Sequence, residues 1–143
     1  MTRATLELRT AAERLLELES SAGKRAGRLP AARRVTDRLR QVLSTFLGAG
    51  GYRALLARAL NLAKSEAPEL SAVHLLPDGA IEGLSSDDGN RKRRFTDGEV
   101  VLVAHLLGLL VTFVGEALML RLVHDTWPRV SLSDLDFDEG TIP

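Results

Sequence analysis

Apolar residues recur through the first half of this chain at the spacing by which a helix buries one face. Alternating steps of four and three residues separate them, and glutamate and arginine fill most of the positions between them in the first such stretch. This spacing predicts amphipathic helices. Pro30 suits the first turn of a helix, and Gly48, Gly50 and Gly51 suit the end of one. The pattern therefore predicts three helices, over residues 4–22, 30–47 and 52–66.

The pattern changes between residues 70 and 84. Two short apolar runs, LSAVHLL and AIEGL, flank the sequence Pro77-Asp78-Gly79. Proline presets φ for the second position of a turn, and glycine can take the left-handed conformation that follows. We therefore expect a small β-hairpin over about residues 72–84. It must pack on the helices or pair with the hairpin of a second copy, because two strands alone are only marginally stable.

The longest apolar stretch lies in the last third of the chain. It opens with Thr-Asp-Gly-Glu at residues 96–99, a capping box in which the threonine hydroxyl and the glutamate carboxylate each accept a backbone N–H of the other residue. Trp127-Pro128 closes it, because the residue before a proline disfavours the helical conformation. The stretch predicts one long helix over about residues 97–126. A helix that is apolar on all sides is expected at the centre of a bundle.

These elements predict a mainly α protein, a bundle of about four helices around the long C-terminal helix with a small β-hairpin. At 143 residues, 45% of them hydrophobic, the chain is large enough to bury a core without disulfides or metals. We expect a single helical domain over residues 1–128 that contains the hairpin. An acidic C-terminal tail or short strand is expected over residues 129–143.

One side of the long helix carries small and polar residues within a sequence otherwise dominated by leucine and valine. Small residues let another helix approach closely. This side is therefore expected to be a helix interface, either inside the bundle or between two copies of the chain. The interface candidates are Ala104, His105, Gly108, Thr112, Gly115, Glu116 and Met119.

His105 and Glu116 share this side of the helix but lie about 16 Å apart along its axis, so they cannot touch within one helix. If two copies of the chain crossed antiparallel, each His105 would approach the Glu116 of the other copy. The alternative is that each residue finds a partner in its own chain or at the surface.

Positive and negative side chains balance at 19 each, so no overall field would attract nucleic acid. Arginine is nevertheless concentrated locally, and the basic-patch candidates are Arg33, Arg34, Arg38, Arg91, Lys92, Arg93 and Arg94. They lack the interleaved aromatic residues that stack on bases. We therefore expect a solvated face that contacts the acidic tail, and no nucleic-acid binding.

The sequence offers no recognisable catalytic or metal-binding motif. There is no cysteine, and the three histidines do not stand at the spacing of zinc ligands. We therefore predict no catalytic residue, no cofactor and no metal. The N-terminal stretch lacks the apolar core of a secretory signal, and His105 and Glu116 would be costly at membrane depth. A cytoplasmic protein that does not contact membrane is expected.

These observations favour a non-enzymatic helical protein–protein interaction module with a regulatory, adaptor or assembly role. We expect it to form a homodimer through the long helix and to bind a further protein partner. One alternative is a small-ligand sensor domain with an apolar pocket beside the small and polar side of the long helix. Further alternatives are nucleic-acid binding through the arginine-rich segments and membrane anchoring by the long helix.

Overall fold

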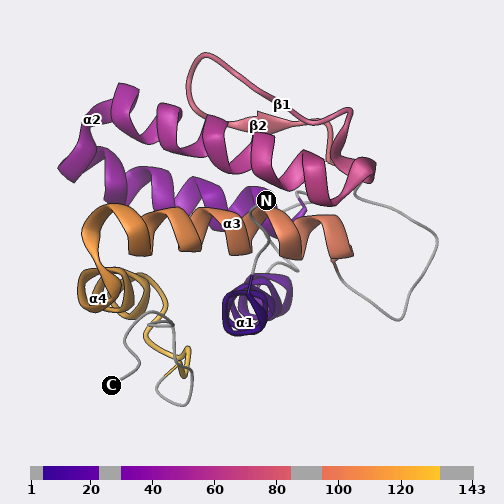
Figure 1. Ribbon diagram of the computed structural model, residues 1–143. Helices are drawn as coiled ribbons and strands as arrows, with labels where there is room; N and C mark the ends of the chain where they lie inside the picture. Colours follow the sequence, from indigo (N-terminus) through magenta and orange to yellow (C-terminus); the bar gives the residue numbers. More distant parts are fainter. Residues whose placement is uncertain (1–4, 23–29, 85–94, 133–143) are drawn as a thin grey trace, which may run out of the picture.

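The structure of the protein, a computed structural model, describes residues 5–22, 30–84 and 95–132. The elements are α1 (Leu6–Ala22), α2 (Ala31–Glu66), the short 3-10 helix η2 (Pro68–Leu70), β1 (His74–Leu75), β2 (Ile81–Glu82), α3 (Asp97–Val114) and α4 (Glu116–Thr126), as Figure 1 shows. The predicted fold class, a mainly helical bundle with a small hairpin, is confirmed.

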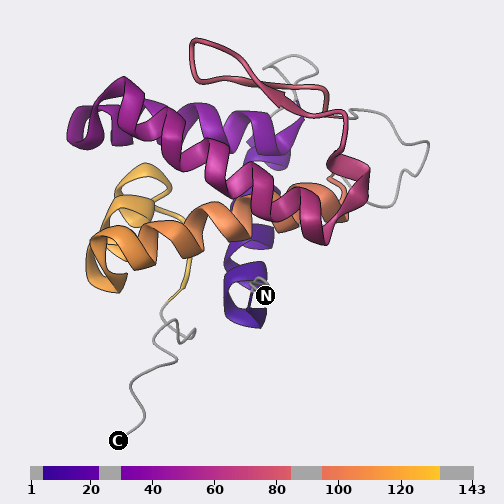
Figure 2. The ribbon, with the colours of Figure 1, turned by 45° about the horizontal axis from the view of Figure 1, so that its top comes forward.

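Helix α2 consists of two helical halves joined at Gly48. This glycine has a φ of 77° and a ψ of 162°, outside the helical region, and the chain turns back at this point in Figures 1 and 2. Residues with a Cβ rarely adopt this conformation. The halves correspond to the predicted second and third helices. However, Gly50 and Gly51 are helical and do not end a helix.

The structure corrects the prediction of one long helix over residues 97–126. Gly115, at φ 95° and ψ 156°, separates α3 from α4, and α4 leaves the axis of α3 at this corner in Figure 1. The N–H of Gly115 donates to the Val111 carbonyl at 2.9 Å and completes the last turn of α3. The apolar pattern continues through Gly115, so hydrophobicity alone could not reveal the corner. The predicted ends, a capping box at Thr96 and a stop after Thr126, are confirmed.

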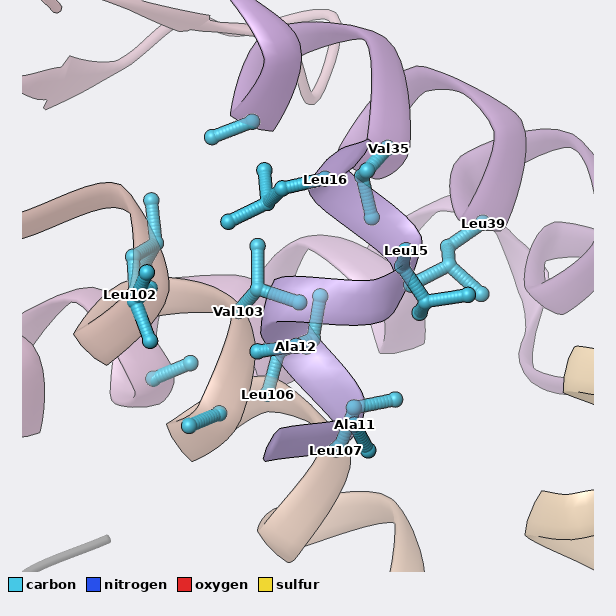
Figure 3. Close-up of a cluster of buried hydrophobic side chains, with 14 of the residues drawn as sticks. Ala11, Ala12, Leu15, Leu16, Val35, Leu39, Leu102, Val103, Leu106 and Leu107 are labelled. Carbon is cyan, nitrogen blue, oxygen red and sulfur yellow. The ribbon is translucent and has the colours of Figure 1, made fainter. Parts of the chain in front are cut away.

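The first half of α3 is the centre of the bundle. Every residue from Val100 to Leu107 is at most 3% exposed, because α2 covers one side of the helix and α1 crosses another, as the two views show. Figure 3 shows the side chains where these three helices meet. Those labelled are Ala11, Ala12, Leu15 and Leu16 of α1, Val35 and Leu39 of α2, and Leu102, Val103, Leu106 and Leu107 of α3.

The predicted hairpin is present but short. His74 pairs with Glu82 and Leu75 with Ile81 in an antiparallel register. The N–H of Leu76 donates to the Ala80 carbonyl at 2.7 Å across the turn. Ile81 is buried, which fixes the hairpin to the helices.

Packing continues beyond the domain boundary expected at residue 128. Val130 and Leu132 are each only 7% exposed, although neither lies in a strand. An arginine of α1, Arg14, donates to the Ser131 carbonyl and holds this segment against the bundle. The remainder of the predicted acidic tail, residues 133–143, lies outside the described residues.

Candidate interaction surface

The buried carboxylate of Glu99 caps two helices at once. One oxygen accepts the N–H of Thr96 at 3.0 Å, and the Thr96 hydroxyl accepts the N–H of Glu99 at 3.2 Å, which completes the capping box. The other oxygen accepts the N–H of Ala32, in the first turn of α2, at 2.9 Å. The first N–H groups of a helix have no partner within the helix. A single side chain therefore stabilises the starts of both α2 and α3.

A second group of polar contacts joins α1, α2 and α3. The Nε2 atom of the buried His105 lies 2.9 Å from a carboxylate oxygen of Glu66. Arg9 donates to the other oxygen of Glu66 at 3.1 Å and to Asp97 at 2.8 Å. His105 therefore has an acidic partner in its own chain, which was the alternative to a cross-chain pair with Glu116.

Glu69 adds a further contact at the start of α3, where its carboxylate accepts the N–H of Gly98 at 2.8 Å. Negative side chains are favourable here because the helix dipole is positive at its N-terminus. We call the group Glu66, Glu69, Asp97 and Glu99 the carboxylate end of the molecule. These side chains accept N–H groups at helix N-termini or form ion pairs.

The opposite end of α3 has a different composition. Gly48 and Gly115 both turn the chain there, at the same end of the molecule in Figures 1 and 2. Among the described residues four large hydrophobic side chains are exposed, namely Leu6 (74%), Phe113 (65%), Phe46 (62%) and Leu118 (38%). All but Leu6 lie within three residues of one of these two glycines. We call Phe46, Gly48, Phe113, Gly115 and Leu118 the glycine-corner end.

The segments that form the glycine-corner end are almost free of charge. No charged residue occurs between Arg40 and Arg53 in the sequence. None occurs between Glu99 and Glu116 either, apart from the buried His105. Glu116, which is half-buried, is the one acidic residue between Glu99 and Asp125 in the sequence. An exposed apolar surface with so little charge is typical of a protein contact site.

Three of the seven predicted interface residues are buried inside their own chain. Ala104 and Met119 are fully buried, and His105 is 3% exposed. These side chains are covered by α1, α2 or the rest of the bundle, so a second copy could not reach them in this structure.

The remaining four candidates divide between the bundle and the surface. At Gly108 an added Cβ would lie 3.0 Å from a methyl carbon of Leu8, so this glycine permits the close approach of α1. Thr112 is exposed, while Gly115 and Glu116 are half-buried at the corner. These last three adjoin the glycine-corner end, and their role in an interface stays a prediction.

The described part of the predicted basic patch is engaged in ion pairs. Arg33 binds Asp37 at 3.2 Å, one helical turn away. Arg34 binds Glu19 of α1 at 3.1 Å, and Arg38 contacts the same carboxylate. The sequence did not reveal the second pairing because Glu19 lies on another helix. Arg91, Lys92, Arg93 and Arg94 lie outside the described residues.

Two further predictions can be compared with the described residues. No group of three His, Asp or Glu side chains among them could hold a metal ion. A hollow of about 490 Å³ lies between α4 and the segment after it, whereas the sensor alternative placed its pocket beside the small and polar side of the long helix, from His105 to Glu116. The residues around this hollow are Leu120, Arg121, His124, Val130, Ser131 and Leu132.

Helix α3 is long and apolar enough, by length and composition, to cross a membrane, with a mean hydropathy of 1.8. However, 61% of this stretch is buried within the chain, and the core helix of a soluble protein meets the same criterion. The cytoplasmic localisation stays a prediction.

Comparison of the chain with protein-family models, with curated proteins and with solved structures found no match.

Proposed function

We propose that this protein is a non-enzymatic helical interaction module that forms a homodimer through its glycine-corner end. The observation that carries the proposal is that Phe46, Phe113 and Leu118, three of the four exposed large hydrophobic side chains described, each lie within three residues of one of the two corner glycines. Burial of a phenylalanine side chain contributes about 1.5 to 3 kcal/mol. Contact at this end would therefore be favourable.

The lack of charge at this end favours a second copy of the chain as the partner. A two-fold interface brings the same patch of both copies together. A patch with many charges would then face like charges, whereas residues 41–52 and 100–120 contain one charged residue, Glu116, apart from the buried His105. Few charged groups would have to lose water on association, so the desolvation cost is small.

The backbone at this end supports the same proposal. Both corners are set by glycines with positive φ, and each exposed phenylalanine stands on the last turn of a regular helix. Side chains on rigid elements lose less conformational entropy on association. The proposed interface differs from the one predicted from sequence, because it involves the end of α3, the start of α4 and the residues of α2 beside Gly48.

The test compares Phe113→Ser and Phe46→Ser with Leu6→Ser. Leu6 is the matched control because it is at least as exposed as the two phenylalanines but lies on α1. The native mass is measured by analytical ultracentrifugation over a range of concentrations, and circular dichroism checks the fold. We expect a wild-type dimer, a dimer dissociation constant raised at least about tenfold by either Phe variant, and no change for Leu6→Ser.

A wild-type protein that remains monomeric at high micromolar concentration would contradict the proposal. An equal effect of all three substitutions would also contradict it, because it would show that exposed apolar area in general, and not the glycine-corner end, drives association.

A further inference from the structure

A second hollow, separate from the glycine-corner end, lies where α1, the first half of α2 and the end of α4 meet. Its volume is about 390 Å³. A ligand site of this size accommodates a few residues of a peptide or a small organic molecule. The residues around it are Leu18, Glu19, Arg38, Thr126, Trp127, Pro128 and Arg129.

A buried carboxylate organises one wall of this hollow. Glu19 is 2% exposed and accepts the indole N–H of Trp127 at 2.7 Å. It also accepts the Nε–H of Arg34 at 3.1 Å and contacts the Nε atom of Arg38. The carboxylate thus fixes an aromatic ring and a guanidinium group beside each other. Fixed side chains of this kind are typical of preorganised binding sites.

Among the described residues Glu19 is the one partner of Arg38, and the terminal nitrogens of Arg38 are the atoms that we expect a ligand to bind. The contact with Glu19 involves its Nε atom, and the side chain of Arg38 is 49% exposed. Arg129, also exposed, has no ion pair or hydrogen bond among the described residues. A guanidinium group binds a carboxylate through two parallel hydrogen bonds. The hollow therefore offers two such groups.

The charge and the walls of the hollow define the chemistry of its ligand. Around the hollow, Arg38 and Arg129 carry two positive charges against the single negative charge of Glu19, which leaves an excess of one. Leu18, the indole of Trp127 and Pro128 are apolar. The complementary ligand therefore combines carboxylates with an apolar or aromatic group.

We propose that the Arg38–Arg129 hollow is the docking site for an acidic peptide segment of a partner protein, with its carboxylates on Arg38 and Arg129 and an aromatic side chain beside Trp127. This proposal is independent of self-association, because none of these residues belongs to the glycine-corner end. A second contact surface would allow one module to bind both its own copy and a different partner.

The experiment titrates the full chain with the synthetic peptide Asp-Leu-Asp-Phe-Asp and follows the fluorescence of Trp127, the one tryptophan of the sequence. Isothermal titration calorimetry gives the affinity independently of the fluorophore. We expect saturable binding to the wild type. Arg129→Gln should weaken this binding at least about tenfold, and Arg38→Gln should weaken it more than Arg129→Gln does. Arg58→Gln, an exposed arginine on the second half of α2, is the control and should bind like the wild type.

Three outcomes would overturn the proposal. The first is a wild-type protein that does not bind the peptide by either method. The second is equal binding of Asn-Leu-Asn-Phe-Asn, which would show that the carboxylates are not recognised. The third concerns residues 134–138 of this chain, which have the probe's own sequence. If only a chain with these aspartates changed to asparagine bound the probe, the hollow would belong to the chain's own segment and not to a partner.

Discussion

The two ends of α3 differ in what holds them together. At the carboxylate end, Glu66 contacts Arg9 and His105, and Asp97 contacts Arg9. Glu99 caps the start of α2 as well as that of its own helix. These contacts join α1, α2 and α3. At the glycine-corner end, the chain direction is set by the backbone of Gly48 and Gly115, and the neighbouring large side chains face solvent.

This difference separates stability from surface chemistry. Buried polar contacts are costly to break, because each leaves an unsatisfied group behind. Such contacts at the carboxylate end fix the relative positions of the helices. The apolar side chains at the glycine-corner end can then vary with little effect on folding, which is the property a contact surface needs. Three predictions test this division, in order of decreasing effect on stability.

The largest effect is expected for Glu99→Ala. The substitution leaves the N–H groups of Thr96 and Ala32 without their acceptor. We expect the free energy of unfolding to fall by about 2 to 4 kcal/mol, from the loss of a cap and of a buried acceptor. Urea denaturation provides the measurement. Asp97→Ala is the control, because this exposed carboxylate makes an ion pair worth less than about 1 kcal/mol. An equal loss of unfolding free energy in the two variants would contradict the assignment of Glu99 as the cap of both helices.

A smaller effect is expected when a methyl group is added at the Gly48 corner. An added Cβ meets no atom within 4 Å at either Gly48 or Gly50, so the two positions differ in backbone conformation and not in available space. Gly48→Ala should lower the free energy of unfolding by about 1 to 3 kcal/mol, because φ is positive. Gly50→Ala should raise it by up to about 1 kcal/mol, because the residue is helical. Thermal denaturation of both variants tests the contrast, and the same sign for both would refute it.

The smallest effect is expected for Tyr52→Phe. The Tyr52 hydroxyl donates to the Thr36 carbonyl at 2.8 Å and joins the two halves of α2. Its loss should cost about 1 kcal/mol at neutral pH. Burial raises the pKa of Tyr52 well above its usual value, with a smaller opposing influence from Arg40. As the pH rises, the Tyr52 phenol therefore loses its proton at a lower pH in the unfolded chain than in the folded protein.

The stability that Tyr52 contributes is therefore fully present below about pH 10 and declines as the pH rises above it. The advantage of the wild type over Tyr52→Phe should shrink over this range in denaturation experiments. Tyr52 is the one tyrosine of the chain, so tyrosinate absorbance can follow its ionisation directly. Parallel pH profiles for the two proteins would disprove the assignment.

Much of the fold could be predicted from hydrophobic periodicity and capping signals. The spacing of apolar residues located α1 and both halves of α2, and Thr96 with Glu99 located the start of α3. The corner at Gly115 was missed because an isolated glycine in an apolar stretch fits equally well in a packed helix. Only tertiary contacts decide whether the chain bends there.

The candidate surface was harder to predict. Phe46 fits the apolar spacing of its helix, yet it is exposed, because it lies in the last turn before Gly48, where the bundle ends. Phe113 is not among the small and polar residues of the long helix, so its apolar side chain was expected to be buried. The partners of His105 and Arg34 are Glu66 and Glu19, on other helices. Pairing between residues so distant in sequence depends on how the helices cross, which periodicity does not describe.

The shared cap of Glu99 also couples two distant parts of the chain during local unfolding. If the first turn of α2 opens, the carboxylate loses the N–H of Ala32, and if the first turn of α3 opens, it loses its position beside α2. Neither helix can fray without weakening the cap of the other. The two helix starts should therefore open as one cooperative unit, although 67 residues separate Ala32 from Glu99.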